Sequence, residues 1–222
     1  KARDVLQKLT RTDLSSASFP WLSAKQIDVN LAPSVAARVN FVGELGWELH
    51  HPIEYQNHIF DALMSAGVEF GLKPFGIRAM DAMRLEKSYR MVGTEMSIEY
   101  AALESGLDRF VQLQKPDFIG RSGLLAWQEK GFANSFVTLA VKDTTDRDVI
   151  GGNPIYKEGK LIGRATSGGY GFRIGKSLAL AMVTPDCTDI GTSLEIDILG
   201  DRFAAEIVEE SPFDPANERL RV

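Results

Sequence analysis

A glycine-rich string at residues 43–48 (GELGWE) carries the first candidate for chemistry. Glycine takes a positive φ readily or lets the backbone approach a ligand, and Gly43 and Gly46 lie three residues apart. Glu48 closes the string. A carboxylate pointing from such a turn into a cleft can accept two charge-assisted hydrogen bonds from a guanidine-like edge, such as an aminopyrimidine. The same spacing is typical of a plain hairpin turn, so the pattern leaves both interpretations open.

An arginine held by an acidic neighbour is the second candidate. Arg78 and Arg84 flank Asp81, three residues to each side, in a segment predicted to be helical. Such a trio can be a solvated salt-bridge ladder, worth about 0.2–0.5 kcal/mol per pair. Alternatively, Asp81 holds an arginine that reaches an anionic or carbonyl group. Of the two arginines, we expect Arg84 to be the structural one.

Several other chemistries find little support. Cys187 is the only cysteine, which excludes a disulfide within the chain and a CxxC metal or redox motif. His50 and His51 are neighbours on a predicted strand and should face opposite sides, so we expect no metal site. Residues 168–176 (GGYGFRIGK) lack the order of a phosphate-binding loop and favour a β-turn with packed aromatic residues.

The composition sets the broad class. The chain has 222 residues, 44% of them hydrophobic and 25% charged, with a net charge of −5. This is typical of one large or two small globular domains and argues against long disorder. The acidic balance argues against a basic nucleic-acid-binding face, and no apolar run reaches the roughly 18 residues of a membrane span. We therefore expect neither nucleic acid nor a membrane as a partner.

The first half of the chain alternates predicted helices and strands. The spacing of apolar residues predicts helices over 1–10, 55–66 and 75–89, strands over 26–30 and 35–42, and a returning strand over 47–50. Pro33 and Ser34 are expected to separate the first two strands, and residues 35–50 to form a hairpin. In the helix over 75–89 we expect Ile77, Met80, Met83 and Leu85 to be buried, with Arg78, Asp81, Arg84 and Lys87 outside that stripe or at its border.

The second half changes character. Residues 90–122 read as irregular, and a short helix is predicted over 122–130. Short alternating strands follow over 136–141, 153–157, 160–167, 178–183, 193–198 and 202–208, with turns at pairs such as Gly168-Gly169. This spacing predicts a small antiparallel barrel or sandwich. The fold class is therefore α+β, with domains expected over 1–122 and 123–222. Because the chain opens at Lys1 inside a predicted helix, we expect it to be the C-terminal piece of a longer protein.

Five strings taken together resemble one family. They are residues 38–49 (RVNFVGELGWEL), 76–87 (GIRAMDAMRLEK), 104–121 with ESGL and KPDFIGR, 166–169 (TSGG) and 212–215 (PFDP). In this order they resemble the aminomethyltransferase, or glycine-cleavage T-protein, family. The third string is similar to the version found in sarcosine and dimethylglycine dehydrogenases.

The resemblance implies that tetrahydrofolate binds in a central funnel and accepts a one-carbon unit. Glu48 matches the family's pterin-binding glutamate, and Arg78 matches its folate-binding arginine. Arg109 and Arg219 stand where the family has aromatic residues, and Phe110 is the candidate to supply a missing ring. These five residues are the candidate folate contacts.

The resemblance also implies what this chain lacks. The family's catalytic aspartate and any FAD domain lie upstream, so we expect this chain alone to be inactive and to need the upstream part of its own polypeptide. The fold implied is the C-terminal part of the folate-binding domain, with ferredoxin-like α/β elements, followed by a small β-barrel. A bacterial cytoplasm or the mitochondrial matrix is the expected location. The alternatives are a stand-alone aminomethyltransferase and a non-catalytic regulatory module of the same fold.

Overall fold

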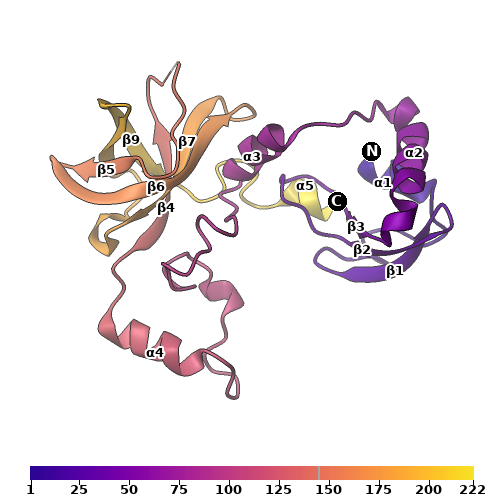
Figure 1. Ribbon diagram of the computed structural model, residues 1–222, viewed down its shortest axis with the longest axis horizontal. Coiled ribbons are helices and arrows are strands. Elements are labelled where there is room, and N and C mark those ends of the chain that lie inside the picture. The colour runs from indigo at the N-terminus through magenta and orange to yellow at the C-terminus, as the bar shows by residue number, and fades with distance from the viewer. Residues whose placement is uncertain (145) are drawn as a thin grey trace. The chain divides into compact units, whose positions relative to one another are not determined.

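The computed structural model describes residues 1–144 and 146–222, which divide into two compact units. Lys1–Asp81 and Ala216–Val222 form the first unit, and Ala82–Pro215 form the second. The fold is mixed α+β, which confirms the predicted class (Figure 1). The domain boundary expected after residue 122 falls inside the second unit and, as a boundary between sequence domains, stays a prediction.

A three-stranded antiparallel sheet organises the first unit. Its strands are β1 (Ala24–Val29), β2 (Ala32–Ala37) and β3 (Glu48–His50), in the order β1-β2-β3. One face packs against the helices α1 (Ala2–Gln7) and α2 (Gln56–Gly67). The buried core residues here are Leu6, Leu14, Phe19, Ile27, Val29, Ala32, Ala36 and Ile59. The opposite face of the sheet is exposed, which explains the alternating pattern of these strands.

The turn between the first two strands differs from the prediction. Asn30 and Leu31 form it, with positive φ values of 46° and 71°. Pro33 lies inside β2, opposite Asp28, so the break expected there is wrong. Pairing with β3 begins only at Val35, which leaves Pro33 in a two-stranded part of the sheet, where a missing N–H is tolerated. The predicted hairpin between β2 and β3 is confirmed, but β2 ends at Ala37 and residues 38–47 form a long connection.

The helix α3 (Ile77–Leu85) begins in the first unit and ends in the second. It is shorter than predicted, and its expected apolar stripe is only partly right, because Ile77 is 73% exposed. Leu85 is buried, as predicted, but so are Arg84 and Lys87, which were expected outside the stripe or at its border. The prediction assumed one core along the whole helix, whereas only its last turn is buried.

A closed antiparallel barrel of six strands organises the second unit, as predicted. The strand order is β4-β7-β6-β5-β8-β9, and β4 also pairs with β9 to close the barrel. The strands are β4 (Ser135–Val141), β5 (Pro154–Lys157), β6 (Lys160–Gly171), β7 (Lys176–Val183), β8 (Ser193–Ile198) and β9 (Asp201–Val208).

The Gly168-Gly169 pair lies within β6 and not at a turn, which corrects the prediction. A Cβ atom on Gly168 would approach the Cβ of Val149 to 2.4 Å, so the glycine is required for close packing. The turn follows at residues 172–175 instead, and Tyr170 packs edge-on against Phe172, with 5.1 Å between ring centroids. Cys187 is a free cysteine, buried among the residues of the barrel core.

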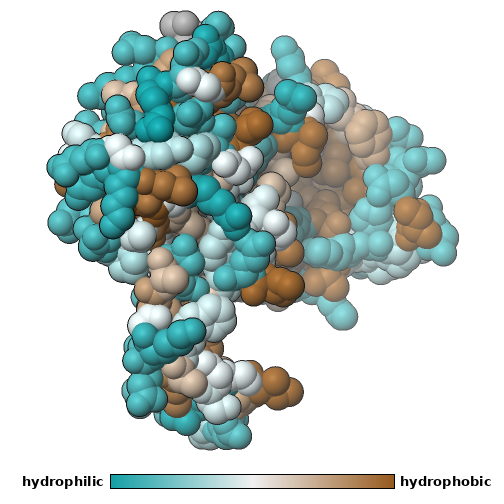
Figure 2. All heavy atoms as spheres, turned by 60° about the vertical axis from the view of Figure 1, so that its left-hand side comes forward, coloured by the Kyte–Doolittle hydropathy of each residue, from teal (hydrophilic) through white to brown (hydrophobic). Residues whose placement is uncertain are grey.

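A segment with little regular structure connects α3 to the barrel. It contains the helix α4 (Arg121–Lys130), which projects from the barrel, and it carries exposed apolar side chains (Figures 1 and 2). Among these are Ile98, Phe110, Ile119 and Trp127. No helix in the described part of the chain is long and apolar enough to cross a membrane.

Candidate functional site

Glu48 is the first residue of β3 and lies on the exposed face of the sheet. Its strand position opposes Ala37 of β2, and the next residue, Leu49, packs toward the core. The Glu48 side chain is 53% exposed, and its Oε2 lies 3.8 Å from Nε2 of His50, the next residue on the same face. At that distance the imidazole makes an ion pair only when protonated and is not a hydrogen-bond partner. The carboxylate is therefore open to accept hydrogen bonds from a ligand.

An open hollow lies on the same face of the sheet, beside His50. Its volume is about 590 Å³, and its polar lining comes from the exposed positions of β1 and β2 and from the end of β3. The lining on this face includes Gln26, Asp28, Pro33, Val35 and His50, with His51 beyond the end of β3. Both histidines border it, although strict strand alternation would separate them, because β3 ends at His50. Within the described residues, no group of three potential metal ligands is found.

The glycine-rich string forms the last part of the connection before β3. Gly43 has a positive φ of 75°, and its N–H donates a hydrogen bond of 2.8 Å to Oδ1 of Asn40. The expected use of glycine for a left-handed backbone is therefore confirmed at Gly43, whereas Gly46 has no positive φ. Trp47 packs against the core, edge-on to Phe19 at 6.1 Å. Because alternate strand residues face opposite sides, this inward tryptophan directs Glu48 outward.

The last residues of the chain meet this string. Nε of Arg219 lies 2.9 Å from Oε2 of Glu44, and both side chains are partly exposed. Arg219 belongs to the short helix α5 (Glu218–Arg221), which is part of the first unit. The structure thus brings one sequence-predicted residue, Arg219, to the motif that contains another, Glu48. The role of Glu44 in this pairing had no signal in the sequence, since its partner lies far away along the chain.

Arg78 is the second residue of α3 and is exposed to solvent. It forms no hydrogen bond or ion pair within the described residues, so the salt-bridge ladder considered for Arg78 is not formed. No contact between described residues joins Arg78 to Glu48, and their convergence on one cleft stays a prediction. An uncompensated guanidinium on the surface is available for an anionic or carbonyl group.

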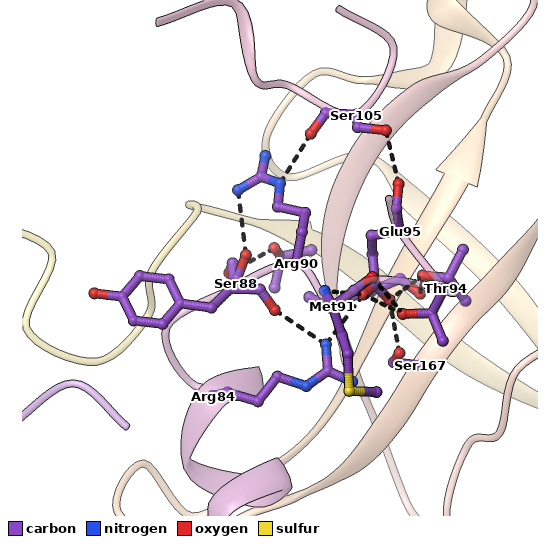
Figure 3. A network of polar contacts seen from close by, with 12 residues as sticks. Arg84, Ser88, Arg90, Met91, Thr94, Glu95, Ser105 and Ser167 are labelled. Atoms are coloured by element: carbon purple, nitrogen blue, oxygen red, sulfur yellow. Dashed lines mark hydrogen bonds and ion pairs between the residues drawn. The ribbon is translucent and has the colours of Figure 1, made fainter. Parts of the chain in front are cut away.

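Arg84 has the opposite surroundings. Its side chain is 1% exposed, and Nη1 donates hydrogen bonds to the backbone oxygen of Tyr89 at 3.0 Å and to Oε2 of Glu95 at 3.2 Å (Figure 3). Glu95 is fully buried and also accepts hydrogen bonds from Thr94, Thr166, Ser167 and the Met91 amide, at 2.6–2.9 Å. The expectation that Arg84 is the structural arginine is confirmed.

This network shifts the pKa of Glu95. Burial alone raises the pKa of a carboxyl group, and for Glu95 it is the largest single influence. Four hydrogen bonds to the charged carboxylate outweigh this effect of burial. The donors are the hydroxyl groups of Ser167, Thr166 and Thr94 and the backbone amide of Met91. The pKa of Glu95 therefore lies below its ordinary value, and the carboxylate stays charged opposite Arg84.

Two more charged residues after Arg84 are buried. Oε1 of Glu86 accepts a 2.6 Å hydrogen bond from the backbone N–H of Arg173, and the two side chains are ion-paired. Nζ of Lys87 donates to the backbone oxygens of Phe213 and Asp214 at 2.9 and 2.7 Å. Burial lowers the pKa of Lys87, against the attraction of Asp214. These residues fix the end of α3 to the barrel unit, a role that the sequence did not reveal.

Arg109 and Phe110 lie in the second unit, in a single turn of 3-10 helix at Asp108–Phe110. The Arg109 guanidinium stacks over the Phe110 ring at 4.8 Å, and Phe110 is 67% exposed. Together they form an exposed cationic and aromatic pair that could stack on a flat ligand ring. Their place as folate contacts stays a prediction.

Comparisons with known proteins agree with this architecture. Residues 1–115 match the family described as the GCVT N-terminal domain, and residues 134–214 match the glycine cleavage T-protein C-terminal barrel domain. The chain is 42% identical to human mitochondrial dimethylglycine dehydrogenase over its whole length and 30% identical to mouse mitochondrial sarcosine dehydrogenase over 99% of it. It spans only 26% and 25% of the lengths of those two proteins.

A solved structure supports the fold independently. The crystal structure of the glycine cleavage system aminomethyltransferase T from Bartonella henselae superposes with a TM-score of 0.84. The match covers 97% of this chain and 58% of that one, at 20% sequence identity. At this identity the likeness establishes the fold alone.

Proposed function

Since the chain belongs to the glycine cleavage T-protein family, we propose that it supplies part of a tetrahydrofolate site in an enzyme of one-carbon metabolism. The one observation that carries the proposal is the placement of Glu48. Its carboxylate is exposed on an open sheet face, beside a polar hollow, and has no hydrogen-bond partner among the described residues.

The chemistry of Glu48 fits a reduced pterin. The aminopyrimidine edge of a pterin presents parallel N–H donors, and a carboxylate accepts such a pair with both oxygens. Arg78 adds an exposed guanidinium, which suits the carbonyl or carboxylate groups of folate. When bound, tetrahydrofolate supplies the nitrogen atoms that accept a one-carbon unit. The residues of this chain bind and orient it.

The whole protein, in this proposal, removes a methyl group from a small amine. The overall similarity to dimethylglycine and sarcosine dehydrogenases supports an amine-demethylating enzyme, with FAD held only by an upstream part of the polypeptide. Tetrahydrofolate and that upstream part are the proposed partners. The mitochondrial relatives support the mitochondrial matrix as one location, beside a bacterial cytoplasm.

The test is the substitution Glu48→Gln in the whole protein. Glutamine replaces a charged bidentate acceptor by an amide with one acceptor, and a charge-assisted hydrogen bond is worth roughly 1.5–3 kcal/mol. We expect tetrahydrofolate affinity to fall about ten- to a hundredfold, measured by calorimetry, with amine oxidation at the flavin retained. Glu54→Gln is the matched control, because Glu54 is exposed and forms no ion pair among the described residues.

Each outcome decides between the alternatives. Unchanged affinity in Glu48→Gln contradicts the proposed site. A protein that binds no tetrahydrofolate at all would instead be a non-catalytic module of the same fold. Folate-dependent transfer without any flavin-containing segment would indicate a stand-alone aminomethyltransferase.

A further inference from the structure

The segment Ala216–Val222 packs on the first unit, against the connection that leads to Glu48. Leu220 is 1% exposed, which anchors the segment in the unit. The buried guanidinium of Arg38 donates hydrogen bonds to the backbone oxygens of Leu220 at 3.2 Å and Val222 at 2.8 Å. A buried arginine with main-chain acceptors is a strong anchor, because leaving it unpaired is costly.

These contacts fall on one stretch of chain. Arg38 is the first residue of the connection 38–47, and Glu44, the partner of Arg219, lies in its middle. The guanidinium of Arg38 also faces the Trp47 ring, at 6.0 Å, near the end of the connection. Figure 1 shows α5 beside the chain that enters β3. The C-terminal segment therefore holds the connection at its start and at its middle.

The connection needs such support. It is much longer than a tight hairpin turn, whose geometry alone would set the strand register. Gly43 adds conformational freedom in its centre, and residues 38–47 lie outside the strands, so no ladder of strand hydrogen bonds fixes the connection. Glu48 follows the connection directly, so any motion of the connection also displaces the Glu48 carboxylate.

We propose that Ala216–Val222 is a strap that orders the glycine-rich connection, and that the Arg219–Glu44 pair is its positioning contact for Glu48. Arg219 then acts through Glu44, as a positioning residue, and not by touching the ligand. The part concerning ligand affinity rests on the proposed tetrahydrofolate site. The part concerning order in the connection stands without it.

The affinity test uses Arg219→Met, Glu44→Gln and the double variant in the whole protein. An exposed ion pair is worth little, so each single variant should lower tetrahydrofolate affinity by about two- to fivefold. The double variant should bind tetrahydrofolate no more weakly than the weaker-binding single variant, because the two single substitutions remove the same contact. Reversing the pair, with Glu44→Arg and Arg219→Glu together, should restore most of the affinity.

A second readout needs no ligand. Amide hydrogen exchange over residues 43–48 should become faster in both single variants and return toward the original rate in the reversed pair. The control is Arg202→Met, which breaks the partly exposed pairs with Glu195 (3.6 Å) and Asp197 (3.5 Å) on the barrel. It should change neither the exchange of residues 43–48 nor the affinity.

Unchanged exchange in both single variants overturns the strap. So does weaker binding in Arg219→Met with normal binding in Glu44→Gln, which would indicate a direct ligand contact of Arg219. If the unsubstituted protein binds no tetrahydrofolate, the proposed function fails, and the exchange measurement still decides whether the strap exists.

Discussion

Two arginines of one helix, α3, have opposite surroundings. Arg84 is buried in the second unit and is held by Glu95 and the Tyr89 backbone, whereas Arg78, in the first unit, is exposed and has no partner among the described residues. The two lie in one charged string of the sequence and cannot be told apart by residue type. The difference shows that the string combines a residue that holds the fold with a residue available for a ligand.

The same substitution at both positions gives the sharpest test of this contrast. Arg84→Met leaves the Glu95 carboxylate buried without its cation, and breaking a buried pair in this way costs about 3–5 kcal/mol. We expect a loss of that size in the free energy of unfolding, measured by urea denaturation. A loss below about 1 kcal/mol would show that the hydroxyl and amide donors alone satisfy Glu95.

The close packing of the barrel predicts a smaller effect. Gly168→Ala places a methyl group 2.4 Å from the Cβ of Val149 and 2.5 Å from its backbone oxygen. Overpacking of this kind costs about 1–3 kcal/mol. Gly123→Ala in α4 is the control, because its Cβ meets no atom within 4 Å, and alanine favours a helix. Equal stability of the two variants would contradict the packing seen around β6.

Acid should lower the free energy of unfolding through the buried network, by less than the two substitutions above. The pKa of Glu95 in the folded protein is lowered, so its contribution to stability is fully present above its ordinary value of 4.5. That contribution is lost as the pH falls from there through the folded-state pKa. Urea denaturation at a series of pH values should show a steeper decline below pH 4.5 for the unsubstituted protein than for Glu95→Gln. Identical pH profiles of the two proteins would show that Glu95 is not the source of the loss of stability in acid.

The smallest expected effect on stability belongs to the other arginine. Arg78→Met should change the free energy of unfolding by no more than about 0.5 kcal/mol, because the side chain removed is exposed and has no partner among the residues that the structure describes. The proposed site predicts that the affinity of this variant for tetrahydrofolate nevertheless falls about tenfold, because the charged hydrogen bond proposed between Arg78 and the ligand would be lost. A large loss of stability would place Arg78 with Arg84 as a structural residue and erase the contrast between them.

Local patterns predicted most of the regular elements. The strand at 193–198 coincides with β8, and the helix predicted over 122–130 differs from α4 by one residue. Periodicity succeeds here because each element packs one face on one core. It failed at the start of α3, which lies outside any core, and at Gly168-Gly169, where glycine serves packing and not a turn.

Alternation and turn residues in the sequence predicted the α+β class and, for the second half, a barrel or a sandwich. The order of the motifs predicted the family and, through it, the barrel. Which charges are buried became clear only from the packing of the folded chain. Glu86 and Lys87 find their partners in distant segments of the second unit, and Glu95, the partner of Arg84, is held by the distant residues Thr166 and Ser167. The same packing brings Arg219 to Glu44, although the two lie 175 residues apart in the chain. Burial and long-range pairing depend on which segments pack together, and that information is not present in the local spacing of residues.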